Sequence, residues 1–172
     1  MKKRIRMFIM IILIALAIYL VIWRFWPNSF SNTISVNENS IDRVSIHAMV
    51  NHFGMGQDTI DTYLIDDLNQ PINMLEEIID ILTTSSYRQD FRNLLPWDLD
   101  HVDADKNQDG RIVSVSFYMG NDKDEYAQIQ FLSSSIIVVS SGGETGFRVY
   151  HPTSPKTIDQ LVEYLQTYGV KQ

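Results

Sequence analysis

Acidic and amide side chains alternate in the segment Asp-Lys-Asn-Gln-Asp-Gly-Arg-Ile, which runs from Asp105 to Ile112. Calcium is a hard cation that takes six to eight oxygen ligands and accepts short acidic side chains at alternate positions. The residue types and their spacing therefore indicate a candidate calcium site. Its side-chain oxygens belong to Asp105, Asn107 and Asp109.

This segment resembles the first eight positions of an EF-hand-type calcium loop. The resemblance implies that Gly110 makes the sharp turn and that Arg111 supplies its backbone carbonyl oxygen. It also implies that the remaining ligands of the half-loop are the side chains of Asp105, Asn107 and Asp109.

Two features depart from that loop. Its twelfth position is Ser116 in place of a bidentate Glu, and a strand pattern follows in place of a helix. A bound ion would need further oxygens, with candidates Asp100, Asp103, Asp124 and Glu125. The alternative interpretation is an exposed acidic turn, because Asp, Asn and Gly are favoured in turns for backbone reasons alone.

A second cluster contains His47, Met49, His52 and Met55. Imidazoles and thioethers together can hold Cu(I). If residues 43–50 form a strand, His47 and Met49 share one face, whereas His52 and Met55 follow its end. Ordinary strand and turn composition explains the cluster equally simply, so we predict no copper site.

Hydrolase motifs are missing from the sequence. It contains no G-x-S-x-G, H-E-x-x-H or S-x-x-K pattern. The glycine-rich segment 142–146 lacks the Lys-Ser/Thr ending of a phosphate-binding loop and is typical of a hairpin turn. We therefore predict no catalytic residues and no cofactor other than calcium.

Aromatic residues are frequent in the second half of the chain. Strand alternation places Tyr118 on the side opposite Phe117, so a single core layer cannot bury both side chains. A binding face for a peptide or glycan is therefore a hypothesis, and core packing is its alternative. The aromatic residues concerned are Tyr87, Phe91, Trp97, Phe117, Tyr118, Tyr126, Phe147 and Tyr150.

The elements that position these residues begin with a long apolar segment. From Met7 to Trp23 the chain has seventeen residues without charge, Gly or Pro, and with three more residues it matches the thickness of a bilayer core. Aromatic rings at its far end, including Trp26, suit the headgroup zone, and Pro27 ends the helix. This predicts a membrane anchor that contacts lipid and spans residues 1–26 together with its basic start.

Positive charges precede this segment. Lys2, Lys3, Arg4 and Arg6 lie before it, so the positive-inside rule places the N-terminus in the cytoplasm and the body outside. The alternative is a cleaved signal peptide and a secreted protein, although Ser29-Phe30-Ser31 is a poor cleavage sequence.

The body is strongly acidic. Residues 25–172 contain nine basic and 21 acidic residues, a formal net charge of −12, whereas the whole 172-residue chain carries −7. Such a charge argues against nucleic acid as a partner, because binding to phosphates requires cations. The chain has no cysteine, so disulfides and thiol chemistry are excluded.

Hydrophobic periodicity predicts the fold class. Asn and Ser dominate residues 27–40, which read as a polar stalk, and residues 41–172 are predicted to form one domain. Helical stripes with caps at Asn73 and Ser154 predict two helices, and Gly169 suits a left-handed residue at the end of the second helix. Residues 87–95 allow a third, short helix. Alternating or continuous apolar patterns predict about six strands, at 43–50, 60–64, 113–118, 127–131, 136–139 and 147–151.

Together these elements predict an α+β protein: a transmembrane helix followed by a two-layer domain, with an antiparallel sheet packed by two or three helices.

The order of these elements, with Val113–Tyr118 and Ala127–Phe131 around a polar turn, resembles small single-pass extracytoplasmic domains of Gram-positive bacteria. The resemblance implies a fold and a location and brings no catalytic residues. We expect a membrane-tethered binding or sensory module with a protein or envelope partner. The alternatives are a calcium-stabilised ligand-binding domain and an envelope hydrolase.

A calcium titration separates the two interpretations of residues 105–112. Binding should change the intrinsic fluorescence of Trp97 or raise the melting temperature at about 5–10 mM calcium, roughly the range that saturates weak extracellular sites. An ordinary acidic turn should change neither quantity, and that outcome would remove calcium from the account.

Overall fold

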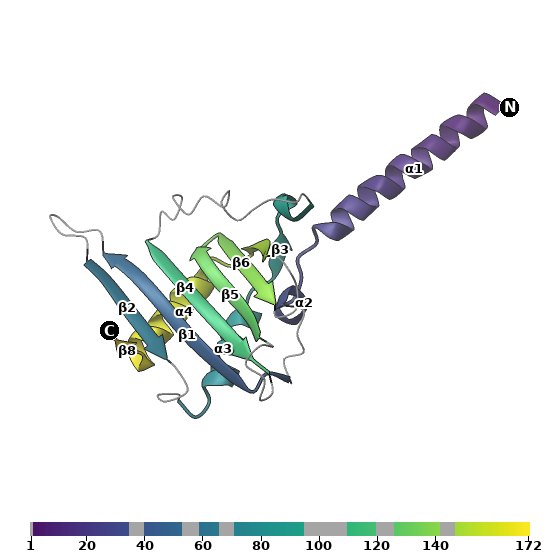
Figure 1. Ribbon diagram of the computed structural model, residues 1–172. Helices are drawn as coiled ribbons and strands as arrows, with labels where there is room; N and C mark the ends of the chain where they lie inside the picture. The colour runs from purple at the N-terminus through teal and green to yellow at the C-terminus, as the bar shows by residue number, and fades with distance from the viewer. Residues whose placement is uncertain are drawn as a thin grey trace.

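The computed structural model describes residues 2–34, 40–52, 59–65, 71–94, 110–119, 126–141 and 147–172. Helix α1 (Lys2–Arg24) projects away from a folded body that contains all the other elements (Figure 1). Within the described residues, Ile5–Arg24 is the one segment long and apolar enough to cross a membrane, and its side chains are exposed. The expected apolar N-terminal helix is confirmed, and a signal sequence would have the same properties.

The body is built on one antiparallel sheet. Its strand order is β3-β7-β6-β5-β4-β1-β2-β8, and the last four expected strands form the predicted meander β4-β5-β6-β7. The strands are β1 (Arg43–His52), β2 (Thr59–Ile65), β3 (Tyr87–Gln89), β4 (Arg111–Tyr118), β5 (Tyr126–Ser133), β6 (Ile136–Ser141), β7 (Phe147–Pro152) and β8 (Val170–Lys171).

The sheet thus has eight strands and not six. The two that the sequence missed are the edge strands β3 and β8, with three and two residues. Segments this short contain no readable period, and β3 falls where a short helix was considered. The helical tendency there survives as the 3-10 helix η2 (Phe91–Leu94), which follows β3 directly.

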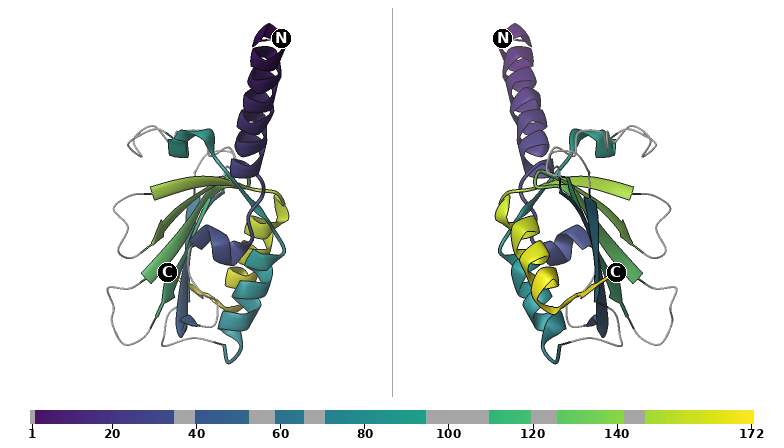
Figure 2. Two further views of the ribbon diagram at one scale, coloured as in Figure 1. Left: turned by 90° about the vertical axis from the view of Figure 1, so that its right-hand side faces the viewer. Right: turned by 90° about the vertical axis from the view of Figure 1, so that its left-hand side faces the viewer.

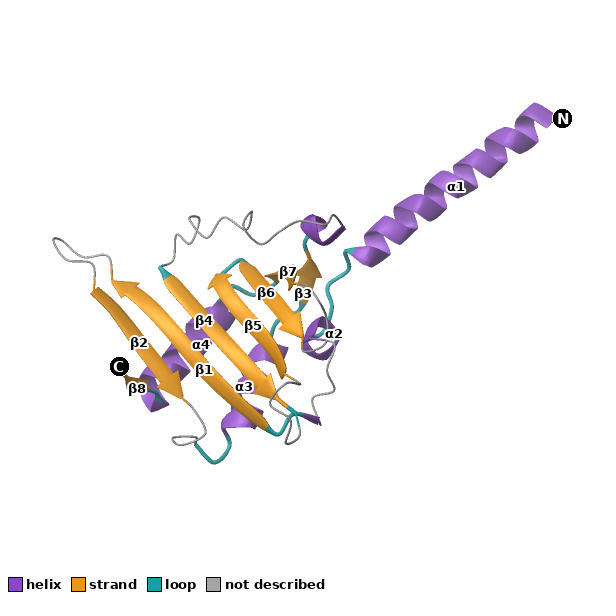
Figure 3. Ribbon diagram, in the orientation of Figure 1, coloured by secondary structure: helices purple, strands orange, loops and turns teal. Residues whose placement is uncertain are grey.

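The helices α2 (Phe30–Ile34), α3 (Met74–Thr83) and α4 (Lys156–Tyr168) all lie on one face of the sheet (Figures 2 and 3). Their apolar stripes pack against the alternate strand residues that face them, which confirms the two-layer α+β class. Fully buried members of this core include Phe30, Ile46, Ile78, Phe117, Ile129 and Leu161.

The first half of the expected stalk is part of the domain. Phe30 and Ile34 of α2 are 1% and 0% exposed, and Asn28 pairs with Tyr87 beside β3. The prediction of a free stalk over residues 27–40 is therefore wrong for residues 28–34. Asn and Ser indicated a linker by composition, but a single turn of helix needs only two apolar side chains to join the core.

Three expected helix ends also differ. Asn73 makes no side-chain cap bond, because its φ of −110° and ψ of 17° lie outside the extended conformation that a capping residue adopts. Gly169 has a φ of −77° and is not left-handed. A side chain is excluded there for another reason, since a Cβ atom would lie 2.4 Å from the carbonyl oxygen of Leu165. Helix α4 begins one residue later than predicted, with Pro155 at the N-cap position, and the Oγ of Ser154 accepts a hydrogen bond from the backbone N–H of Lys156 at 3.3 Å.

Replacing Phe30 by alanine should lower the free energy of unfolding of the body by about 3–5 kcal/mol, the usual cost of emptying a buried phenylalanine site. Phe147→Ala is the matched control. Its ring is 55% exposed, so the change should stay within about 0.5 kcal/mol. Urea unfolding of the full chain in detergent measures both values, and equal stabilities would contradict the placement of α2 in the core.

Candidate functional site

One face of the sheet carries no described helix, and we call it the open face. It consists of the strand residues that alternate with the core residues of β1, β2 and β4–β7. In Figure 2 the helices α2, α3 and α4 lie on one side of the sheet, and the open face is the other side.

Cross-strand pairing arranges the open face in rows of polar and apolar side chains. Two neighbouring rows carry hydroxyl, amide or imidazole groups at their centre, whereas the row of Thr62, Met49 and Ile112 beside them is mainly apolar. One row is Leu64, His47, Ser114, Gln130, Val138 and Val149. The next row is Ser45, Ser116, Gln128, Ser140 and Phe147.

Two long hydrogen bonds join polar groups at the centre. Gln128 Nε2 donates to Ser116 Oγ at 3.4 Å, and Ser45 Oγ lies 3.4 Å from Tyr118 Oη. Both distances exceed the usual range, so these bonds are weak. A hydroxyl can donate one hydrogen bond and accept two, and a carboxamide can make four, so these side chains are rich in hydrogen-bonding groups.

An aromatic residue with a cation above it borders this centre. The guanidinium carbon of Arg43 lies 5.2 Å from the centroid of the Tyr118 ring, a cation–π arrangement across the β1–β4 pair. Tyr118 thus lies on the open face while Phe117 is buried in the core, as the alternation predicted. Of the other aromatic candidates, Tyr87 and Tyr150 are buried and Phe91 and Phe147 are exposed. The side chains of Trp97 and Tyr126 lie outside the described set.

The end of the open face at β6 and β7 is covered. Val138 and Val149 are each 5% exposed although they lie on the opposite side from the core residues Ile137 and Val139. This confirms the prediction that the apolar run 136–139 is a strand buried on both faces. The accessible part of the open face is therefore its polar centre together with β1, β2 and Phe147.

Charge is distributed unequally between the two layers. The positions of the open face hold no Asp or Glu in any described strand. The helical layer instead carries the exposed carboxylates Glu76, Glu77, Asp80, Asp159 and Glu163. The face of the sheet opposite α2, α3 and α4 is thus also the face whose described strand positions carry no carboxylate.

Two ion pairs fix acids at the edges of the sheet. Asp61 lies 2.8 Å from Lys171 and, as the largest effect, raises the pKa of that lysine. Asp90, 8% exposed, lies 2.7 Å from His151 Nε2. The Nδ1 of the same ring donates to the carbonyl oxygen of Ser135 at 2.8 Å. Because internal partners occupy both ring nitrogens, this His–Asp pair has no nitrogen left to act on a substrate.

The calcium candidates are only partly described. Asp105, Asn107 and Asp109 lie outside the described residues, as do the four additional acids considered with them. Gly110 has a φ of 63°, as a sharp turn at that position requires. Its carbonyl oxygen accepts a hydrogen bond from Asn51, and Arg111 begins β4 with its guanidinium paired to Asp159. Across the described part of the chain no three His, Asp or Glu side chains form a metal-binding group.

The other candidate residues occupy separate places. His47 and Met49 share the open face of β1 as expected, whereas Met55 lies outside the described residues. The anchor residues Met7, Trp23 and Trp26 are 59%, 67% and 65% exposed along and just beyond α1. The chain matches no protein-family model, no curated protein and no solved structure.

Replacing His151 by alanine tests whether its pair with Asp90 is structural. The variant leaves a nearly buried carboxylate without its imidazole, which should lower the free energy of unfolding by about 1–3 kcal/mol. His47→Ala on the open face is the control, with an expected change within about 0.5 kcal/mol. If H151A is as stable as the parent protein, the pair is not structural and a functional role must be reconsidered.

Proposed function

We propose that this protein is a single-pass membrane protein whose body is a binding module without catalysis, with the N-terminus in the cytoplasm and the body outside. The open face of the sheet binds the partner, a protein or another envelope component. The observation that carries the proposal is the accessible part of the open face: a sheet surface with hydrogen-bonding groups and no described carboxylate, which ends where Val138 and Val149 are covered.

The anchor rests on helix α1. Its side chains from Ile5 to Arg24 are all exposed, so no protein surface covers the uncharged run from Met7 to Trp23. A bilayer supplies an apolar environment for this run. The basic residues at positions 2–6 and the acidic body favour an orientation with the body outside.

Electrostatics favours the open face over the helical layer as the binding surface. The exposed acids of α3 and α4 repel other acidic proteins. The open face carries hydroxyls and amides with the cation of Arg43 beside them, and such neutral groups cost little to desolvate when each finds a partner. The apolar residues Met49 and Ile60, 38% and 60% exposed, add area that is buried on binding. The partner surface that fits is therefore broad, rich in amides or hydroxyls, and weakly charged.

Single-cysteine variants test both parts of the proposal, because the natural chain has no cysteine. Met49→Cys and Phe147→Cys place the reactive group on exposed positions of the open face, and Glu76→Cys and Glu163→Cys place it on the helical layer. Each variant is labelled on intact cells with a membrane-impermeant maleimide that carries a benzophenone, and is then illuminated.

All four variants should be labelled on intact cells if the body lies outside. Crosslinked products should form from the two open-face positions and not from the two helical positions. Labelling that requires cell lysis would refute the orientation. Crosslinks of equal yield from both layers would refute the open face as the binding surface.

A further inference from the structure

The apolar helix α1 joins the body without a flexible connection. Three residues separate Arg24 from Asn28, whose backbone N–H and C=O both bond to Tyr87 at 2.8 Å. Helix α2 follows at once and is held in the core by Phe30 and Ile34. The direction of α1 and the orientation of the sheet are therefore coupled.

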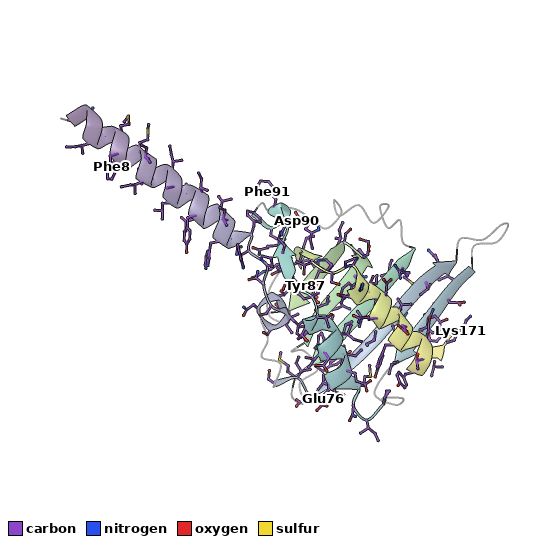
Figure 4. The ribbon with its side chains drawn as sticks, turned by 180° about the vertical axis from the view of Figure 1, so that it is seen from behind. Phe8, Glu76, Tyr87, Asp90, Phe91 and Lys171 are labelled. Carbon is purple, nitrogen blue, oxygen red and sulfur yellow. The ribbon has the colours of Figure 1, made fainter. Side chains whose placement is uncertain are left out.

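Two aromatic side chains, Phe25 and Phe91, meet at the end of α1. The Phe91 ring stacks on the Phe25 ring with centroids 6.5 Å apart and planes 24° from parallel, yet Phe91 is 65% exposed (Figure 4). Trp26, which follows Phe25 in the sequence, is also 65% exposed. A cluster of large rings that the fold leaves in contact with solvent has the composition of a membrane-interface belt.

The fold holds Phe91 firmly in this position. It lies on η2, and the Asn93 side chain of η2 binds both backbone groups of Val149, with Nδ2 donating at 2.7 Å and Oδ1 accepting at 2.8 Å. The Asp90 backbone N–H adds a third bond to the Val149 carbonyl at 2.9 Å. Phe91 is thus presented by a rigid turn fastened to β7.

The strand order runs away from α1. In Figure 1, β3, β6 and β7 lie nearest to the helix, β2 and β8 lie farthest from it, and the strands run across its direction. If α1 crosses a bilayer, the strands run parallel to the membrane surface. Strand β3 then lies nearest to the membrane, and each following strand in the sheet lies farther from it. With strands about 4.8 Å apart, the far edge stands roughly 34 Å beyond β3.

We propose that η2 is a second membrane-contact site, at which Phe91, together with Phe25 and Trp26, enters the headgroup zone of the bilayer that α1 spans. This inference rests on the proposed anchor. The lipid is the occupant because the cluster is continuous with the apolar helix. The exposed Arg88 on β3 and Arg24 at the end of α1 add positive charge suited to anionic headgroups.

This contact makes the sheet stand edge-on to the membrane. Both faces then point sideways, so the bilayer does not cover the open face, which is accessible to a partner beside the protein. The membrane then holds the body at two points, α1 and η2, and both favour the same direction of the open face.

Fluorescence quenching tests the contact in the full chain, reconstituted in phosphatidylcholine–phosphatidylglycerol vesicles whose acyl chains are brominated near the headgroup. The Phe91→Trp variant is made in a chain whose three native tryptophans are replaced by phenylalanine. Its emission should shift to shorter wavelength and be mostly quenched. Ile60→Trp in the same background is the control, exposed on β2 far from α1, and should be unaffected.

A chain that keeps only the native Trp23 separates this inference from the anchor. Quenching of Trp23 without quenching of the F91W variant would overturn the contact and leave the anchor standing. An unquenched Trp23 would overturn the anchor itself.

A second measurement avoids altering the Phe91 ring. A nitroxide on the Arg88→Cys variant should be more accessible to lipid-soluble oxygen, and less accessible to a water-soluble nickel chelate, than one on the Ile60→Cys variant. Equal accessibilities at the two positions would overturn the proposal.

Discussion

The paired backbone bonds between Asn28 and Tyr87 constrain the rest of the molecule. Tyr87 is fully buried, and its hydroxyl donates to the Leu82 carbonyl near the end of α3 at 2.8 Å. Burial raises the pKa of this phenol, which keeps the proton needed for that bond. One residue thus connects the exit of the apolar helix, the edge of the sheet and a core helix. This connection fixes the direction of α1 relative to the sheet.

The two layers of the body differ in charge. The exposed acids of the helical layer disfavour contact with other acidic surfaces, whereas the open face presents hydroxyls, amides and an aromatic ring beneath Arg43. A sheet face in water must be polar enough to remain soluble, and charged residues usually serve that purpose. On the open face Ser, Gln and Thr keep the surface soluble. Removing water from these neutral groups costs less free energy than removing it from charged groups.

Much of the candidate surface was present in the sequence without being recognised there. The alternation of Val with Ser in β4, and of Ile with Gln in β5, predicted two strands correctly and already contained the uncharged polar positions. Each strand shows its two faces but not its neighbours, because pairing and register depend on long-range contacts. The rows that cross five or six strands could therefore not be predicted, and neither could the packing of α2, α3 and α4 on the same face of the sheet.

By itself, the sequence determined the class and order of the elements: an apolar helix at the start, an acidic α+β body, the meander and the stripes of α3 and α4. These follow from local periodicity, which hydrophobic burial enforces over neighbouring residues. Only the tertiary structure decided that Phe30 and Ile34 belong to the core and that Phe91 lies beside Phe25. The physical reason is that a short segment has too few residues for a period of its own, so its place is fixed by contacts with residues far along the chain.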